Sequence, residues 1–249
     1  MSGVKGRVVI VTGASSGIGE AAAAGLVRRG ARVAMVARRG ERLAALIEKL
    51  RGEGAAGEAA AFECDVTSRD GVRAMVERVE GGLGPVDALV NNAGVMINSF
   101  VEKEREEEWA RMVDVNINGV LHCTAAVIGG MLARGSGHFV NVSSVAGRRL
   151  FPGAAVYCAT KHFVHAFSEG LRSEVTKHGL RVTVVAPGLV ETELHDHATD
   201  PDMIERAKNR PPMRWLTSED VAREIVHAME APAHVSVNEV LMRPTDQEN

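Results

Sequence analysis

Short runs of β-branched and other apolar residues alternate along this chain with longer segments in which apolar residues recur at helical spacing. The runs are typical of buried strands and fall at residues 7–12, 32–37, 59–64, 86–90, 138–143, 182–186 and 235–242. The segments between them predict helices at 17–29, 41–50, 68–80, 104–133, 154–177 and 219–229. Because strands and helices alternate over the whole length, the pattern predicts an α/β fold: one doubly wound parallel sheet of about seven strands with helices on both faces.

The chain of 249 residues is expected to form a single domain, 1–249. No linker, repeat or low-complexity tract divides it, and the glycine-containing stretch 52–57 is short enough to be a loop between a helix and a strand. The segment at about 189–215 is long, carries three prolines and is predicted to contain short helices. A segment of this length in a compact domain is typically functional, so we expect it to act as a lid over a substrate.

The amino-acid composition excludes several classes of function and cellular location. Lys and Arg number 29 and Asp and Glu number 32, a formal net charge of −3, and no basic block suggests binding to a nucleic acid. The three cysteines are far apart in the sequence, which suits a reducing compartment. The first apolar run is too short for a signal sequence, and no stretch approaches the roughly 18 apolar residues of a membrane span. We therefore expect a cytoplasmic protein that binds neither nucleic acid nor membrane.

A glycine-rich turn joins the first strand to the first helix. Such a turn lets backbone N–H groups and the helix N-terminus meet a pyrophosphate, although a tight turn that merely needs positive φ would use glycine as well. Here the strand and the helix match on both sides, so the turn predicts the dinucleotide site of a Rossmann fold. The expected contacts are Gly13, Ser15, Ser16, Gly17, Ile18 and Gly19.

The residues after the second strand distinguish two dinucleotides. In an NAD site an acidic residue about 20 positions after the glycines binds the adenosine ribose hydroxyls. Here Ala37 holds that place and is followed by Arg38 and Arg39. No carboxylate repels a 2′-phosphate, and two guanidinium groups have the bidentate geometry to bind one, although both arginines could equally be solvated residues at a helix start. The missing acid and the added bases agree, so we predict NADP(H).

The sequence holds a single tyrosine, Tyr157, four positions before Lys161 on a predicted helix. The two side chains therefore share a helix face. A protonated lysine favours tyrosinate, so we expect the pKa of this phenol to lie below its usual ~10. That would prepare Tyr157 for proton transfer to or from a substrate oxygen. A pair at this spacing is common, and a surface pair without function is the alternative.

Together with other motifs, this pair identifies a family. The chain resembles the NADP-preferring short-chain dehydrogenase/reductase family over essentially its whole length. The motifs are, in order, TGASSGIG from Thr12, NNAG from Asn91, Asn116 in the long helix, the serines 143–144, YxxxK from Tyr157, and Pro187-Gly188 followed by Thr192. The tail from Arg243 is similar to that of the clavulanic-aldehyde reductases within this family.

The resemblance implies a catalytic set and a coenzyme set. Tyr157 would be the general acid–base, Lys161 would bind the nicotinamide ribose, and Ser144 would polarise the substrate carbonyl. Ser144 is preferred to Ser143 because the family places this serine 13 positions before the tyrosine. Asn116 would hold a water that links Lys161 to solvent, through a carbonyl exposed where the helix is irregular. The further coenzyme contacts would be Asp65, Val66, Asn92, Ala93, Gly94, Tyr157, Lys161, Pro187, Gly188, Val190 and Thr192.

The implied reaction is hydride transfer between nicotinamide C4 and a carbonyl or alcohol carbon. Reduction of an aldehyde or ketone in secondary metabolism, like that of clavulanic aldehyde, is the first interpretation. A 3-hydroxy-acid or serine dehydrogenase and a 3-oxoacyl reductase stay open, and so does an isomerase, epimerase or dehydratase. A non-catalytic NADP-binding regulator would be expected to have lost catalytic residues, and all four are present.

Two pairs of side chains near the expected substrate end have alternative roles. Arg148 and Arg149 could bind a substrate carboxylate, but a plain surface pair is favoured. His195 and His197 have a spacing that would suit a metal, but no third ligand is evident, so no metal site is predicted. The family resemblance also implies a homotetramer built on the helices at 104–133 and 154–177.

Overall fold

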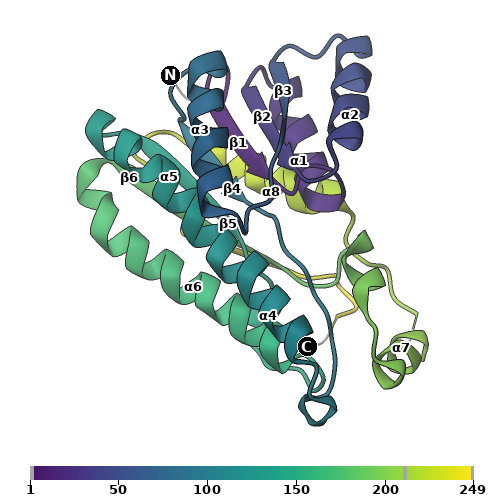
Figure 1. The fold of residues 1–249 in the computed structure, drawn as a ribbon. Helices are drawn as coiled ribbons and strands as arrows, with labels where there is room; N and C mark the ends of the chain where they lie inside the picture. The colour runs from purple at the N-terminus through teal and green to yellow at the C-terminus, as the bar shows by residue number, and fades with distance from the viewer. Residues whose placement is uncertain (1–2, 210–211, 248–249) are drawn as a thin grey trace.

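The computed structural model of the chain describes residues 3–209 and 212–247. These residues form one parallel sheet in the order β3-β2-β1-β4-β5-β6-β7 (Figure 1). The expected fold class, a single-domain doubly wound α/β sheet of seven strands, is confirmed. The strands are β1 (Val8–Thr12), β2 (Arg32–Ala37), β3 (Glu58–Glu63), β4 (Ala88–Asn91), β5 (Gly137–Val142), β6 (Leu180–Pro187) and β7 (Glu239–Met242).

Helices cover both faces of the sheet. One face packs against α1 (Gly17–Arg28), α2 (Gly40–Gly52) and α8 (Ser218–Glu230), and the other against α3 (Arg69–Leu83), α5 (Gly119–Arg134) and α6 (Ala155–Val175). The helix α4 (Glu106–Val113) leads towards α5, and α7 (Pro201–Lys208) lies apart from the other helices in Figure 1. The strand order reverses direction between β1 and β4, and ligands of open α/β sheets bind at such a switch point.

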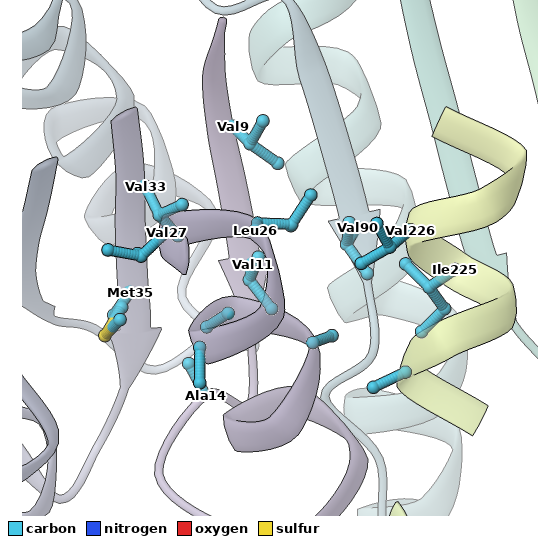
Figure 2. Packing of buried hydrophobic residues seen from close by; sticks show 14 of the residues in the cluster. Val9, Val11, Ala14, Leu26, Val27, Val33, Met35, Val90, Ile225 and Val226 are labelled. Carbon is cyan, nitrogen blue, oxygen red and sulfur yellow. The ribbon is translucent and has the colours of Figure 1, made fainter. Parts of the chain in front are cut away.

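Alternate residues of the central strand enter opposite cores. In β1, Val9 and Val11 belong to the cluster with α1 and α8, part of which Figure 2 shows, whereas Val8 and Ile10 belong to the cluster on the other face. All four side chains are buried. Burial on both faces explains why the strand is an unbroken apolar run rather than an alternating one. Burial of Ile10 alone stabilises the fold by roughly 1.5–3 kcal/mol.

The helix expected over 104–133 is interrupted. The helix α4 ends at Val113, Asp114–Asn118 form one turn of π-helix, and α5 continues from Gly119. At the entrance, Glu104 has a left-handed φ of 50° after a short 3-10 turn, so α4 begins only at Glu106. A π turn holds one more residue than an α turn and is frequent at functional sites. The helix is thus irregular at Asn116, as the resemblance implied.

The last strand is shorter than expected. A strand was predicted over 235–242, but β7 contains only Glu239–Met242. Val235 N donates to Pro232 O at 2.8 Å and closes a turn, and the Thr183 hydroxyl donates to Val237 O at 2.6 Å. These bonds use backbone groups that a longer ladder would need, so the prediction is wrong for the first half of the segment. The other predicted strands shift by two residues or fewer at their ends.

Within residues 3–209 and 212–247, one helical run has the length and composition of a membrane span. Glu106–Arg134 is 29 residues long, and an 18-residue window within it has a mean hydropathy of 1.4. By length and composition, the expectation that no stretch approaches a membrane span is wrong, because glycine, threonine and histidine interrupt the apolar residues of this run yet leave its mean hydropathy high. In that window 39% of the residues are buried inside the protein, where Val127 and Met131 pack in the core cluster shared with the sheet. A core helix passes the same test, so the run is weak support for a membrane span.

Candidate active site

A cavity of about 860 Å³ lies at the carboxyl edge of the sheet, at the switch point between β1 and β4. One end of it is lined by the glycine-rich turn, the end of β2 and the loop after β4. The other end is lined by residues after β5, by the start of α6 and by the segment that follows β6. Segments far apart in the sequence therefore meet here because parallel strands bring their carboxyl ends to one edge.

Glycine is required at three positions of the first turn. Gly13 has a φ of +68° and Gly17 a φ of +58°, a region that only glycine adopts at little cost. A Cβ at Gly13 would lie 2.9 Å from Ala93 Cα, and a Cβ at Gly19 would lie 2.3 Å from Gly13 O. Gly19 is therefore needed to close the turn on itself.

The turn is fixed to the NNAG loop by two side chains. The Thr12 hydroxyl accepts hydrogen bonds from Asn92 N and Ala93 N, both at 3.0 Å, and donates to Val90 O at 3.3 Å. The Asn92 amide donates in return to Thr12 O at 3.0 Å. Thr12 is buried, so these bonds satisfy polar groups that water does not reach. The two loops consequently form one rigid wall.

Three arginines, Arg38, Arg39 and Arg42, follow the end of β2, and together they form the arginine wall. Arg39 donates from Nε to Ser15 Oγ at 3.2 Å and from Nη2 to Ser16 Oγ at 2.8 Å. Its third nitrogen, Nη1, lies 2.9 Å from a carboxylate oxygen of Glu193, and Arg42 Nη1 lies 2.6 Å from the other oxygen. Arg38 lines the cavity next to Arg39. The serines of the turn thus orient one guanidinium at the cavity edge.

Tyr157 and Lys161 lie one turn apart on α6 and both line the cavity. Tyr157 is hydrogen-bonded to the side chain of Ser144, which stands at the end of β5. Lys161 Nζ donates to Val142 O at 3.0 Å and lies 5.8 Å from the centroid of the Tyr157 ring. The three predicted catalytic side chains are therefore gathered at one place. Ser143 also borders the cavity, but its hydroxyl donates to Lys161 O at 3.1 Å, as expected for a structural serine.

Burial dominates the acid–base properties of this pair. Burial raises the pKa of Tyr157 to about 12, and the hydrogen bond with Ser144 offsets only part of that rise. Burial also lowers the pKa of Lys161 to about 8. The expectation that Lys161 brings the pKa of the phenol below ~10 is wrong in this structure, because desolvation outweighs the attraction of an ammonium that bonds to Val142 O instead. Tyr157 is protonated at neutral pH.

Asn116 joins the π turn to both neighbouring segments. Its Oδ1 accepts from Val95 N at 2.8 Å, and its Nδ2 donates to Val95 O at 2.9 Å and to Thr160 Oγ1 at 3.1 Å. Thr160 in turn donates to Tyr157 O at 2.7 Å. The amide is buried, and both of its N–H groups donate in these contacts. In this structure Asn116 holds the helix of Tyr157 against the loop after β4.

All but two of the expected site residues line the cavity. Those in its wall are Gly13, Ser15, Ser16, Gly17, Ile18, Arg38, Arg39, Asp65, Val66, Asn92, Ala93, Gly94, Ser144, Tyr157, Lys161, Pro187, Gly188, Val190 and Thr192. Gly19 and Asn116 are absent from the wall because both are buried behind it, one in the turn closure and one in the clamp on Val95.

Comparison with known protein families shows to which family this chain belongs. A model described as "short chain dehydrogenase" matches residues 7–202. The chain belongs to the short-chain dehydrogenase family. It is accordingly an oxidoreductase with a nucleotide-binding Rossmann fold.

Relatives of this short-chain dehydrogenase include proteins with and without a named substrate. The glycine betaine reductase of Emericella nidulans is 45% identical over 244 residues, which are 98% of this chain but only 19% of that protein. An uncharacterized oxidoreductase of Staphylococcus saprophyticus is 43% identical over 253 residues, 99% of each chain. A solved structure, the closed form of serine dehydrogenase complexed with NADP⁺, is 35% identical with a TM-score of 0.88 and covers 98% of this chain and 97% of that one.

The segment after β6 lines the end of the cavity opposite the glycine-rich turn. It contains a 3-10 turn at Glu193–His197 and the helix α7, so the expected short helices are present. The ring of His195 meets that of Trp215 edge-on at 4.8 Å. Gly153 has a φ of +80°, and a Cβ there would lie 2.3 Å from Met203 Sδ, so α7 packs directly on the loop before Tyr157.

Several residues of this site were not predicted from the sequence. Glu193, Met203, Arg206, Trp215 and Gln247 line the cavity, and Arg42 supports Glu193. Gln247 accepts from Leu189 N at 3.0 Å, so the tail that served only as a subfamily marker contributes to the wall. The pairing of Glu193 with Arg42 spans 151 positions and leaves no local signal.

Arg148 does not face the cavity. Its guanidinium pairs with Glu239 on β7, and it is absent from the cavity lining, as is Arg149. The expectation that these arginines are a surface pair agrees with this placement. Cys158, next to the tyrosine, is buried among apolar side chains, and burial raises the pKa of its thiol. It packs rather than reacts.

Proposed function

We propose that this short-chain dehydrogenase is an NADPH-dependent carbonyl reductase. The observation that carries the proposal is the gathering of Ser144, Tyr157 and Lys161 in the cavity that also holds the glycine-rich turn. A dinucleotide site alone would fit a binding protein, whereas a buried phenol bonded to a serine supplies a proton donor and a carbonyl-polarising hydroxyl.

The residues present fit an NADP coenzyme. Glycines at 13 and 17 keep the turn free of side chains, so backbone N–H groups can approach a pyrophosphate. Arg38 and Arg39 offer guanidinium groups for a 2′-phosphate where Ala37 provides no competing carboxylate. When bound, the coenzyme supplies hydride from nicotinamide C4. The NADP⁺ in the similar serine dehydrogenase structure supports this choice.

The side chains of the chain itself provide proton transfer and orientation. Tyr157 Oη, protonated at neutral pH and with its pKa raised further to about 12 by burial, donates a proton to the carbonyl oxygen as that oxygen gains negative charge. Ser144 Oγ donates a hydrogen bond to the same oxygen and orients it. Lys161 has a pKa of about 8 and is charged at neutral pH, so it favours the transient phenolate. Asn116 keeps α6 in place against the loop after β4, and a water on a carbonyl of the π turn would return the proton.

The proposed substrate is an aldehyde or ketone of secondary metabolism, as for clavulanic-aldehyde reductases. The reductase named among its relatives supports reduction, and the serine dehydrogenase supports the alternative of a 3-hydroxy-acid or serine dehydrogenase. A 3-oxoacyl reductase is a further alternative within the same chemistry. The intact serine, tyrosine and lysine count against a non-catalytic NADP-binding regulator.

We also propose a cytoplasmic homotetramer that binds neither membrane nor nucleic acid. Support for assembly comes from α4 and α5, which leave Val113, Leu121 and Leu132 between 36% and 37% exposed. Apolar side chains along one continuous helix face are typical of an interface between subunits. Sedimentation velocity at micromolar concentration is expected to give a tetramer, and a monomer would contradict the proposal.

The test combines binding with turnover. Titration with NADPH is expected to enhance coenzyme fluorescence, and a panel of aldehydes and ketones is expected to include compounds that oxidise NADPH. Binding without oxidation by any carbonyl would contradict the proposal and favour the regulator. Interconversion of isomers without net oxidation of NADPH would instead indicate an isomerase or epimerase, and loss of water without it would indicate a dehydratase.

A further inference from the structure

The lid carries a carboxylate that reaches the arginine wall. Glu193 lies in the 3-10 turn after β6, and its two oxygens pair with Arg39 at 2.9 Å and Arg42 at 2.6 Å. These bonds join residues 154 and 151 positions apart. The two guanidinium groups lower the pKa of Glu193 to about 2, so the carboxylate is ionised at neutral pH.

The same guanidinium is the proposed ligand of the coenzyme's 2′-phosphate. Arg39 uses Nε for Ser15, Nη2 for Ser16 and Nη1 for Glu193, so a phosphate must displace or share one of these partners. The two serines are part of the rigid glycine-rich turn, whereas the side chain of Glu193 is 45% exposed. Glu193 is therefore the partner that yields.

We propose that Glu193 sets the preference between NADPH and NADH, because its carboxylate competes with the 2′-phosphate for Arg39 and Arg42. The inference rests on the proposed coenzyme site. NADH lacks the 2′-phosphate, so its binding leaves the ion pairs intact. The 2′-phosphate of NADPH, in contrast, brings negative charge close to the Glu193 carboxylate. The affinity of the protein for NADPH is lowered for that reason.

The test measures dissociation constants by coenzyme fluorescence for Glu193→Gln. The Kd for NADPH is expected to fall about three- to tenfold, an effect limited by the exposure of the pair, while the Kd for NADH changes less than about twofold and the gain shrinks at high salt. The matched control is Glu205→Gln, which removes the same charge from α7 without contact to either arginine and is expected to change neither constant. Glu193→Asp, with one methylene less, is expected to shift NADPH in the same direction by a smaller factor.

Two results separate failure of this inference from failure of the proposed function. Tight NADPH binding by the unaltered chain, with an unchanged or weaker Kd in both Glu193 variants, overturns the role of Glu193 and leaves the coenzyme site standing. A chain that binds neither coenzyme overturns the proposed function and the inference together.

A second and independent observation concerns the inner face of α7. Met203, Arg206 and Ala207 line the cavity, and their spacing places them on one side of the helix. Met203 packs on Gly153, four positions before the catalytic tyrosine. The side chain of Arg206 is exposed and makes no hydrogen bond or ion pair with the described part of the chain.

The exposed side chain of Arg206 shares the cavity wall with apolar residues such as Met96, Phe151 and Trp215 and with neutral polar ones such as Asn98 and Asn209. The acidic residues among the described lining are Asp65, which follows β3, and Glu193, whose carboxylate pairs with Arg39 and Arg42. An arginine in such a place offers a bidentate site for a carboxylate or a phosphate. We infer that the carbonyl substrate carries an anionic group that Arg206 binds, which deepens the proposed function.

The test uses pairs that differ only in charge, such as 4-oxobutanoate and its methyl ester. Arg206→Gln is expected to raise KM for the acid by about tenfold or more while changing KM for the ester by less than about twofold. Lys208→Gln, which removes a cation from α7 outside the cavity lining, is the control and is expected to change neither. Equal effects on acid and ester, or reduction of neutral carbonyls with no acid of any pair accepted, overturn the inference and leave the reductase standing. Absence of turnover with every carbonyl removes both.

Discussion

The cavity has two halves, one proposed for the coenzyme and one proposed for the substrate, and they are built in different ways. Its coenzyme half consists of tight turns in which Gly13 and Gly19 touch main-chain atoms and Thr12 bonds three backbone groups. Its substrate half is closed by side-chain contacts such as Met203 against Gly153. Added atoms collide with backbone in the first half and with flexible side-chain ends in the second. Affinity for coenzyme and selectivity for substrate can therefore vary separately.

The largest effect is expected where the halves meet, at the proton donor. Tyr157→Phe removes the hydroxyl without changing the packing of the ring and is expected to lower kcat by about 10²–10⁴-fold. The Kd for NADPH should stay within about twofold, because the phenol contributes little to the coenzyme half. Steady-state kinetics and fluorescence titration measure the two quantities. Ser143→Ala is the control, since the substitution removes a hydroxyl that donates to the backbone oxygen Lys161 O; a similar loss there would mean that packing rather than proton transfer is measured.

A methyl group in the coenzyme half comes next. Gly13→Ala places a Cβ 2.9 Å from Ala93 Cα at a φ of +68°, so the turn must open. NADPH binding is expected to weaken by about 100-fold, since a strained turn of this kind costs on the order of 1–3 kcal/mol. Gly54→Ala has nearly the same φ, +67°, but meets nothing within 4 Å, and should leave binding unchanged. Equal losses would show that backbone strain alone, without the contact to the NNAG loop, controls the site.

A smaller effect is expected from pH at the boundary between the halves. The pKa of Lys161 is lowered to about 8, so reductive turnover should decline as pH rises through that value and the ammonium loses its charge. The unfolded chain holds this proton up to about pH 10.5, and therefore the free energy of unfolding should rise between about pH 8 and about pH 10 by up to a few kcal/mol. Above that, the raised pKa of Tyr157 acts in the opposite direction. Urea unfolding at several pH values should show the rise, and Lys161→Met should remove it.

The smallest effect belongs to the substrate half. Met203→Ala removes the thioether through which α7 contacts Gly153. KM for the carbonyl substrate should rise a few-fold, while the free energy of unfolding changes by less than about 1 kcal/mol. Ile204→Ala, on the next residue with 37% exposure, changes a side chain that does not line the cavity and should leave KM unaltered. A large loss of stability in Met203→Ala would mean that the lid is as firmly built as the coenzyme turn, contrary to the comparison above.

The contrast between the two halves of the cavity also explains which parts of the site can be predicted from the sequence. The glycine turn, the NNAG loop and the Tyr157–Lys161 pair are short patterns, because each depends on backbone geometry or helix spacing within a few residues. The parallel sheet with helices on both faces follows from the alternation of strands and helices, whereas the order of the strands comes from the structure.

Other features depend on tertiary structure and have no local pattern. Glu193 meets Arg42 across 151 positions, and nothing near either residue announces the pair. The pKa of Tyr157 rises because the folded chain buries it, whereas helix spacing considers only its distance from Lys161. The first half of the last strand is lost because Thr183 from β6 takes a backbone carbonyl.

The Thr12 hydroxyl has a consequence for how the protein acquires its activity. It accepts hydrogen bonds from backbone N–H groups 80 and 81 positions away. The coenzyme half of the cavity is therefore formed only after β1 and β4 have come together. Contacts of such sequence separation form late, because loop closure must be completed before they contribute. A partly folded chain should therefore not bind NADPH. Added coenzyme should slow unfolding and raise Tm by mass action, without accelerating folding.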